Sequence, residues 1–439
     1  MPTARRSPPT ASRSRRLPNK PATPQTTPQL PLPSAPTNWA VVIAAFGAGV
    51  VGAAHVGKVP AALPAIRAEF VLDLVTAGWV VSIFSATALL FAMAAGLLSD
   101  RVGHRRIAVG GLLLLAAGSA AGALAASGTM MLATRLVEGL GYIIAVVAAP
   151  SIIAQAAAPK DRRLAVGLWG AFMPTGMGAM LVAAPFLQST IGWRGSWAVT
   201  AALTVIWAAV MAYAFHGWHR VRATAAPERP WRNLLITVRA RGPWLLSLCF
   251  AFYALPWIAL MVWLPTFIVE QRGLPVRYAA LLTVAAVTIN LPGNILGGWL
   301  SHKSVPRGIL VAAAGTMIVV AGPLIYLDLL PDGARFAACL VYSFVCGVVP
   351  AALLGAAPWF APGPGQIATT NGLIVQGSHL GLLSGPPLVA ALVGLTGGWQ
   401  GGALLFAACG AGVLVFAALI HREEGRLATA QGSSESSTP

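Results

Sequence analysis

Long apolar runs, separated by short clusters of charged residues, dominate the chain from Trp39 onward. The windows 74–99, 164–193 and 242–269 contain no Asp, Glu, Lys or Arg. A helix needs about 20 apolar residues to cross the hydrocarbon layer of a bilayer. Each of these windows is therefore long enough to hold a membrane-spanning helix.

Along the whole chain the same pattern predicts an all-α membrane protein with twelve transmembrane helices. We place these helices at 39–64, 74–98, 107–126, 129–157, 163–188, 194–216, 243–269, 278–300, 308–328, 334–357, 367–394 and 399–421. Hydrophobic residues make up 57% of the 439 residues and charged residues only 9%. Soluble domains carry about 25% charged residues, so the composition excludes a soluble fold.

The basic residues predict how the chain is oriented in the membrane. With the N-terminus in the cytoplasm, the inner segments carry 22 Lys and Arg residues and the outer loops carry five. Short cytoplasmic loops are enriched in Lys and Arg, so both termini are predicted to be cytoplasmic. High use of Ala, Gly, Arg and Pro suggests a GC-rich bacterium, which would place the protein in the cell inner membrane. The net charge is +17. Because the basic residues lie in short clusters between apolar runs, they are expected to face water beside the membrane, and no nucleic-acid partner is predicted.

The longest internal loop predicts where the chain divides. The basic, Pro-rich segment 1–38 is expected to be a disordered cytoplasmic tail. The segment 39–216 forms the N-terminal six-helix half, 217–242 a cytoplasmic linker, and 243–421 the C-terminal six-helix half. The remaining residues, 422–439, form a second cytoplasmic tail.

Two short sequence echoes indicate that the halves are repeats. AGLLSDRVGHRR at 95–106 aligns without gaps with GGWLSHKSVPRG at 297–308, and TIGWRG at 190–195 with TGGWQG at 396–401. Both pairs fall at equivalent predicted helix ends. Parallel repeats of this kind are typical of transporters that rock about a central site.

The first of these segments carries a family resemblance. It follows the second predicted helix and resembles the loop signature of the major facilitator superfamily, G-x-L-x-D-R-x-G-x-[RK]-[RK]. The matching residues are Gly96, Asp100, Arg101, Gly103, Arg105 and Arg106. The resemblance covers roughly residues 39–421 and implies that this loop gates one conformational state. In the second-half copy His302 replaces the acid, so a charge latch there should be weaker.

The fourth predicted helix contains a charged pair. The run from Arg135 to Gly141 resembles a second family motif, R-x-x-Q-G-x-G, with Glu138 where Gln is usual. Residues three apart on a helix are neighbours, so Arg135 and Glu138 can pair. Two hypotheses remain open: Glu138 couples transport to protons together with Arg135, or the pair is a permanently ionised structural bridge.

Two further ionisable residues lie in the first predicted helix. Lys58 lies toward its outer end, where its ammonium group can snorkel to the interface. Alternatively, Lys58 and His55 face a substrate cavity, and the cation attracts an anion. The surrounding text, HVGKVPAALPAIRAEF, is similar to the cyanate/nitroimidazole-type porters of the superfamily. That resemblance implies a small solute, an anion among the candidates.

Other polar residues in predicted spans are candidates for the same cavity. They are Tyr253, Trp257, Asn290, Asn294, Gln376 and His379. Pro256 predicts a break in the seventh helix, and Pro174 a kink in the fifth. The fifth helix matches the superfamily's antiporter signature only in part, because Pro174 occupies the position of its second glycine. Trp193 and Trp399, near helix ends, are expected to be interface anchors.

The sequence therefore predicts a secondary transporter that works by alternating access, with a proton as co-substrate. Its expected partners are a small-molecule substrate, the proton and the lipid bilayer. One chain holds both halves, so a monomer is expected. No motif indicates a cofactor, a metal site or an enzyme activity, and no filter motif indicates a channel. A drug or metabolite efflux antiporter and a non-transporting membrane sensor of the same fold remain as alternatives.

Overall fold

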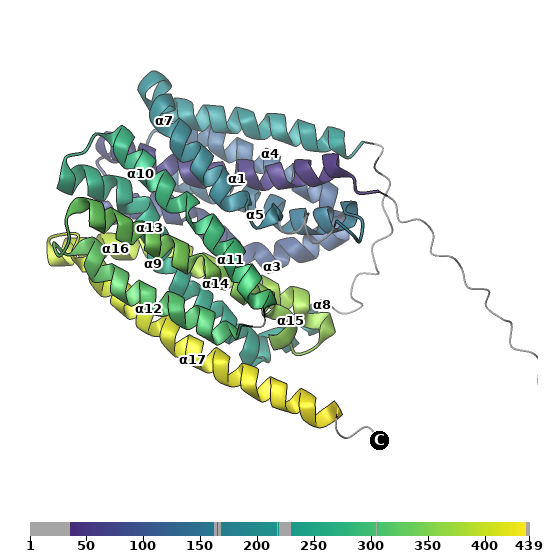
Figure 1. The fold of residues 1–439 in the computed structure, drawn as a ribbon. Coiled ribbons are helices and arrows are strands. Elements are labelled where there is room, and N and C mark those ends of the chain that lie inside the picture. The colour runs from purple at the N-terminus through teal and green to yellow at the C-terminus, as the bar shows by residue number, and fades with distance from the viewer. Residues whose placement is uncertain are drawn as a thin grey trace, which may run out of the picture. The chain divides into compact units, whose positions relative to one another are not determined.

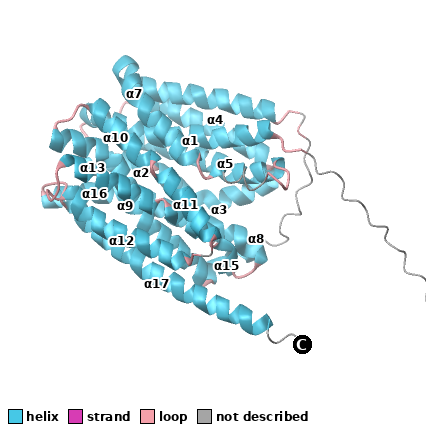
Figure 2. Cartoon of the chain, in the orientation of Figure 1, coloured by secondary structure: helices cyan, strands magenta, loops and turns pink. Residues whose placement is uncertain are grey.

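The computed structural model describes residues 36–161, 165, 168–216, 218, 230–303 and 305–435. Contacts separate Met1–Pro36 from Thr37–Pro439, and the helices belong to the second unit. Within the described residues every regular element is a helix (Figure 2). The predicted all-α membrane fold is confirmed.

The first group of helices precedes residue 217. It comprises α1 (Trp39–Phe70), α2 (Leu74–Ser82), α3 (Phe84–Val102), α4 (His104–Ala123), α5 (Gly128–Ala156) and α7 (Phe172–Ala214). Here α1 packs on α7, and α4 packs on α5 and α7 (Figure 1). Below, the end of the bundle at which α1 begins is called the inner end and the opposite end the outer end, a naming that follows the charge distribution.

The second group follows the short helix α8 (Pro230–Arg239). It comprises α9 (Arg241–Arg272), α10 (Val276–Thr288), α11 (Asn290–His302), α12 (Arg307–Tyr326), α13 (Asp332–Cys346), α14 (Val348–Gly355), α15 (Ala357–Phe360), the 3-10 turn η1 (Pro364–Gln366), α16 (Ile367–Thr396) and α17 (Gly401–Glu435). Here α9 packs on α16, and α12 on α17. The two groups meet where α16 contacts α2 and α3, and where α7 contacts α10.

Twelve spans follow from these helices. Eleven described segments are long and apolar enough to cross a membrane. One of them, α7, has 43 residues and would be about 65 Å long if straight, twice the thickness of the hydrocarbon layer. Gly192 interrupts it with φ 69° and ψ 179°, a conformation essentially confined to glycine. The chain turns there, so α7 supplies two spans.

Two predicted local features are wrong. Helix α9 runs unbroken through Pro256, because neighbouring groups can satisfy the backbone that proline frees inside a membrane. The kink predicted at Pro174 has a counterpart in the structure: the helical pattern is interrupted at Gly170 and Ala171, and Pro174 lies in the first turn of α7, where its missing N–H needs no partner. Helix α17 extends past residue 421 to Glu435; there the Glu424 carboxylate accepts hydrogen bonds from the backbone N–H groups at the start of α12.

The outer end of the bundle shows the internal repeat directly. Trp193 Nε1 donates to Glu69 at the end of α1 over 2.7 Å, and Trp399 Nε1 donates to Glu270 near the end of α9 over 3.2 Å. Both indole rings are buried. They are therefore not the interface anchors that their positions predicted, because each is held inside its own group of helices by a carboxylate.

The outer loop between α1 and α2 is short and well capped. Val71 adopts the left-handed conformation at the end of α1, and Asp73 caps α2 by accepting a hydrogen bond from the Thr76 backbone N–H over 2.7 Å. This hydrogen bond lowers the pKa of the Asp73 carboxyl. The cap directs α2 back into the membrane beside α1.

Candidate functional site

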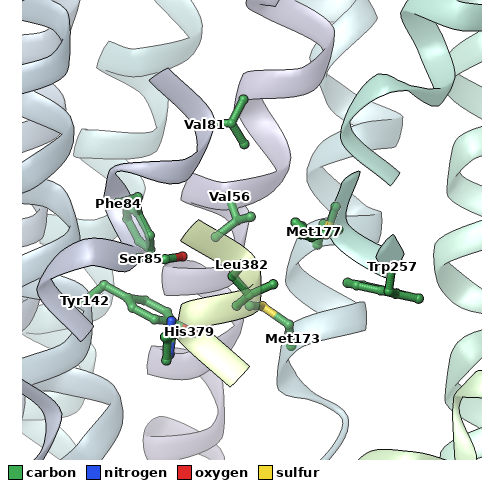
Figure 3. A pocket seen from close by; sticks show the side chains of 11 residues that line it. Val56, Val81, Phe84, Ser85, Tyr142, Met173, Met177, Trp257, His379 and Leu382 are labelled. Carbon is green, nitrogen blue, oxygen red and sulfur yellow. The ribbon is translucent and has the colours of Figure 1, made fainter. Parts of the chain in front are cut away.

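A small cavity lies between the two groups of helices (Figure 3). Seven helices line it, namely α1, α2, α3, α5 and α7 of the first group and α9 and α16 of the second. The lining residues are Val56, Val81, Phe84, Ser85, Tyr142, Met173, Met177, Trp257, Ile258, His379 and Leu382. About 20 Å³ is open to the centre of a water molecule, roughly the room that one water needs. A solute can enter only after the helices separate.

The walls of the cavity are mainly apolar, with aromatic, thioether and aliphatic side chains. Ser85 of α3 and His379 of α16 supply polar side chains to the lining (Figure 3). His379 is buried, and its Nδ1 has no hydrogen-bond partner among the described residues. A buried polar atom without a partner costs free energy. His379 therefore brings unused hydrogen-bonding capacity to the lining.

Contacts between the two groups close the cavity on both sides. Toward the inner end, Gln376 Nε2 donates to the Leu89 carbonyl oxygen over 2.9 Å. Toward the outer end, a Cβ placed on Gly78 would lie 3.0 Å from the backbone of Pro387. The absence of a side chain at Gly78 therefore lets α2 and α16 touch. Both contacts must open in turn if the cavity is to face either side.

A fully buried cluster of charged residues lies behind this cavity, inside the first group of helices. Lys58 Nζ donates to the Glu138 carboxylate over 2.9 Å, and Arg135 Nη1 donates to the same carboxylate. The predicted pairing of Arg135 and Glu138 is therefore present. Lys58 does not snorkel: its side chain is fully buried, because Glu138 on α5 provides a counter-charge that the sequence of α1 alone does not reveal.

Hydroxyl groups from α4 and α7 complete the shell around Lys58. The ammonium group donates to Ser119 over 2.8 Å and to Thr200 over 3.3 Å, and lies 4.4 Å from the ring centre of Trp197. His55, one turn from Lys58, contacts the ammonium group at 3.1 Å and Thr204 at 2.8 Å. Polar contacts therefore surround the buried ammonium group.

The cluster is connected to the cavity through Arg135. Its guanidinium donates to the backbone oxygens of His55 and Val80, which directly precede the cavity residues Val56 and Val81. It also lies 4.6 Å from the ring centre of Phe84, a cavity residue. Its Nη2 has no hydrogen-bond partner among the described residues. When His55 is neutral, Lys58, Arg135 and Glu138 together carry one net positive charge. The ring of Phe84 separates this charge from the cavity.

The other predicted cavity residues are placed elsewhere. His55 and Lys58 belong to the charged cluster, and Gln376 to the inter-group contact. Tyr253 is buried, and Asn290 donates to the Ser343 backbone oxygen over 2.8 Å. Asn294 lies where α11 passes close to Gly347. Of the predicted cavity residues, Trp257 and His379 line the cavity described here.

The signature loop joins α3 to α4. Gly103 has φ +104°, a conformation that favours glycine. The Arg105 guanidinium donates to the Trp218 backbone oxygen and lies 4.2 Å from its ring centre, which ties the loop to the inner end of α7. Gly96 and Arg106 lie on α3 and α4. The side chains of Asp100 and Arg101 lie outside the described residues.

Several site residues carry no distinctive sequence signal. Phe84, Ser85 and Tyr142 line the cavity, and Ser119 and Thr200 bind Lys58. Serine, threonine and aromatic residues are common in membrane helices as packing and hydrogen-bonding groups. Only their convergence in space distinguishes them. Among the described residues, no group of three or more His, Cys, Asp or Glu side chains could hold a metal ion.

Comparison with known proteins places the chain in a family. It is 28% identical over 364 residues to the 3-(3-hydroxy-phenyl)propionate transporter of Escherichia coli, covering 80% of this chain and 85% of that protein. It is 24% identical over 370 residues to the "Probable sulfoacetate transporter SauU" of Cupriavidus necator, covering 78% and 84%. These relatives give no support to the predicted likeness to cyanate or nitroimidazole porters.

The fold is also similar to solved structures of transporters. A bacterial homologue of the human lysosomal transporter Spinster, in an inward-facing and unoccupied conformation, superimposes with a TM-score of 0.74 at 18% identity, covering 90% of this chain and 98% of that one. The family model described as Major Facilitator Superfamily matches residues 39–374. The chain therefore belongs to the major facilitator superfamily of membrane transporters.

Proposed function

We propose that this protein is a secondary active transporter that carries a small organic anion across the bacterial inner membrane by alternating access, coupled to protons. The observation that carries the proposal is the small cavity between the two six-helix halves, lined by His379, whose buried Nδ1 has no hydrogen-bond partner among the described residues. A site at the interface of two repeats can be exposed to each side in turn when the halves rock.

The charge around the cavity supports an anionic substrate. The cluster of Lys58, Arg135 and Glu138 carries an excess positive charge behind Phe84. In a low-dielectric interior such a charge acts over several ångströms. The relatives named above are described as transporters of an aryl propionate and of sulfoacetate, both of which are anions. Aromatic and thioether walls suit the apolar part of such a substrate.

Proton coupling is assigned to Glu138. Protonation would cancel the attraction of Glu138 for both Lys58 on α1 and Arg135 on α5, and would leave two cations facing each other. Because Arg135 also binds the backbone beside Val56 and Val81, the change would move cavity walls. A bound ion can bias a conformational equilibrium only by such a difference in interaction between the two states.

Transport by purified protein in liposomes tests the proposal. Aryl propionates, sulfoacetate, short carboxylates, cyanate and nitrite are screened for uptake with and without an inward proton gradient. Glu138→Gln should abolish gradient-driven accumulation while sparing counterflow of the same solute. The double variant Lys58→Met/Glu138→Gln, which keeps the net charge of the cluster, should behave in the same way.

Three outcomes would contradict parts of the proposal. Loss of both accumulation and counterflow in well-folded variants would make the cluster a structural bridge. Gradient-driven extrusion of a bulky cation would favour the efflux alternative. Specific binding of a solute without transport would favour a sensor.

A further inference from the structure

Helix α8, in the segment between the halves, attaches to the protein through its polar side. Asn233 Oδ1 accepts a hydrogen bond from Gln366 Nε2 over 2.8 Å, and the Thr237 hydroxyl contacts the Thr369 hydroxyl at 2.6 Å. Asn233 and Thr237 are four residues apart and share one face of the helix. That face lies on η1 and the inner end of α16.

The opposite face of α8 is apolar and uncovered. Trp231, Leu235 and Val238 are 60%, 54% and 39% exposed. At 3.6 residues per turn these three positions fall on one side of the helix. A surface helix of a soluble protein shows the reverse arrangement, with its apolar stripe toward the core. The environment that suits the outward face of α8 is therefore apolar.

Arginines flank this apolar face. Arg232 and Arg239 are exposed and lie along one edge of the stripe, seven residues apart. Among the described residues neither forms an ion pair with a carboxylate. The sequence around the helix adds Arg220, Arg222 and Arg229 against a single acid, Glu228. The edge of the stripe therefore fits a negatively charged surface.

The position of α8 indicates which surface that is. Trp244, in the first turns of the membrane-spanning helix α9, donates through Nε1 to the Val238 backbone oxygen over 2.8 Å. This contact holds α8 where α9 enters the membrane. Trp299 and Trp359, at the inner ends of α11 and in α15, are also more than half exposed, and exposed tryptophans are typical of the membrane–water interface.

We propose that α8 lies in the headgroup layer of the inner leaflet and binds anionic phospholipid. Trp231, Leu235 and Val238 insert between the acyl chains, and Arg232 and Arg239 contact the phosphate groups. An interfacial helix with an apolar face and basic edges binds a bilayer through both contributions. Because Asn233 and Thr237 bind η1 and α16, the bound lipid also holds the inner end of α16 at a fixed depth.

Fluorescence quenching in nanodiscs tests the proposal on the full chain. A Leu235→Cys variant carries an environment-sensitive fluorophore, and the native cysteines are buried. Brominated phosphatidylglycerol, titrated into phosphatidylcholine discs, should quench the fluorophore. Removing Arg232 and Arg239 together, as Arg232→Gln/Arg239→Gln, should weaken the apparent affinity for phosphatidylglycerol by about fivefold for each arginine.

A matched double variant controls for net charge. Arg422→Gln/Arg426→Gln removes two exposed arginines from the inner end of α17 and should leave the titration unchanged. Equal weakening in both double variants would overturn the proposal, since it would show a general effect of charge. A fluorophore at position 235, and at 238 in a second variant, that neither brominated phosphatidylglycerol nor brominated phosphatidylcholine quenches would also overturn it.

Discussion

At the scale of single residues, the cluster around Glu138 shows how a buried charge is tolerated. Glu138 has two cationic partners, Lys58 and Arg135. Removing one member of a buried ion pair destabilises a protein strongly when it leaves an uncompensated charge. The two sides of the cluster are therefore unequal: the carboxylate is needed by both cations, whereas each cation can be lost with the other still present.

This asymmetry predicts that a neutral substitution is tolerated at position 58 but not at position 138. Glu138→Gln should lower the free energy of unfolding by about 3–5 kcal/mol, because two buried cations lose their counter-charge. Lys58→Met should cost far less, because Arg135 still pairs with Glu138 and the Ser119 hydroxyl keeps its bond to the Trp197 backbone oxygen. Thermal unfolding of the two variants in one detergent measures the difference. Equal losses of stability would contradict the proposed asymmetry.

His379 gives a second prediction at this scale. His379→Phe keeps a planar side chain but removes the hydrogen-bonding atoms that face the cavity. We expect the KM for the transported solute to rise about tenfold, as for the loss of one hydrogen bond to a charged group. Ser378→Ala is the control, since the Ser378 hydroxyl bonds to the Val375 backbone oxygen and is absent from the cavity lining. A KM unchanged in His379→Phe would remove His379 from the substrate site.

At the scale of elements, glycines decide how closely helices approach. A Cβ on Gly176 of α7 would lie 2.0 Å from the Val50 backbone oxygen of α1, whereas one on Gly178 would meet nothing closer than the Thr288 hydroxyl at 3.5 Å. The two positions belong to the same glycine-rich segment but differ in function. Gly176 permits the part of α7 that precedes Gly192 to pack closely on α1 at Val50 and Ala53.

Substitution by alanine should separate these two roles. Gly176→Ala should destabilise the protein by about 1–3 kcal/mol, the usual cost of overpacking, because it pushes α1 away from α7. Gly178→Ala should be nearly neutral, and in a helix it gains the better propensity of alanine. Thermal stability of the two variants, compared with wild type, is the measurement. A neutral Gly176→Ala would show that α1 and α7 can shift without cost.

At the scale of the whole molecule, an ion pair between described residues joins the halves at the outer end. Arg67 of α1 lies 3.9 Å from Glu270 of α9, and both side chains are partly exposed. Glu69, two residues away, pairs instead with Arg194 inside the first group over 2.5 Å. When the cavity opens outward, the Arg67–Glu270 pair should break while the Glu69–Arg194 pair stays intact.

Substitution of the two arginines should therefore have different effects on the opening of the outer end. Arg67→Gln should raise the outside accessibility of a Val81→Cys reporter by up to about fivefold, since a partly exposed ion pair contributes at most about 1 kcal/mol. Arg194→Gln should leave the accessibility unchanged. Labelling with a membrane-impermeant maleimide measures both. Equal effects would mean that the Arg67–Glu270 pair does not hold the outer end closed.

Several features of the fold could be predicted from local sequence, for a physical reason. Whether a segment such as 242–269 spans a membrane depends on its own hydrophobicity. The internal repeat was equally visible in TIGWRG and TGGWQG, because both copies keep the tryptophan that bonds to a glutamate in the structure. The Arg135–Glu138 pair followed from helical spacing alone. None of these inferences required knowledge of neighbouring helices.

The tertiary structure alone decided which residues meet. Lys58 and Glu138 are 80 positions apart, and the cavity draws its lining from seven helices. Which residues pair across such separations depends on how each helix is rotated about its axis and on how closely it approaches its neighbours. Close contacts at residues such as Gly176 set both the rotation and the approach. Hydrophobicity carries almost no information about rotation in a helix that is apolar on every side. For that reason the spans and the family signature can be recognised in the sequence alone, whereas the site exists only once the helices have packed.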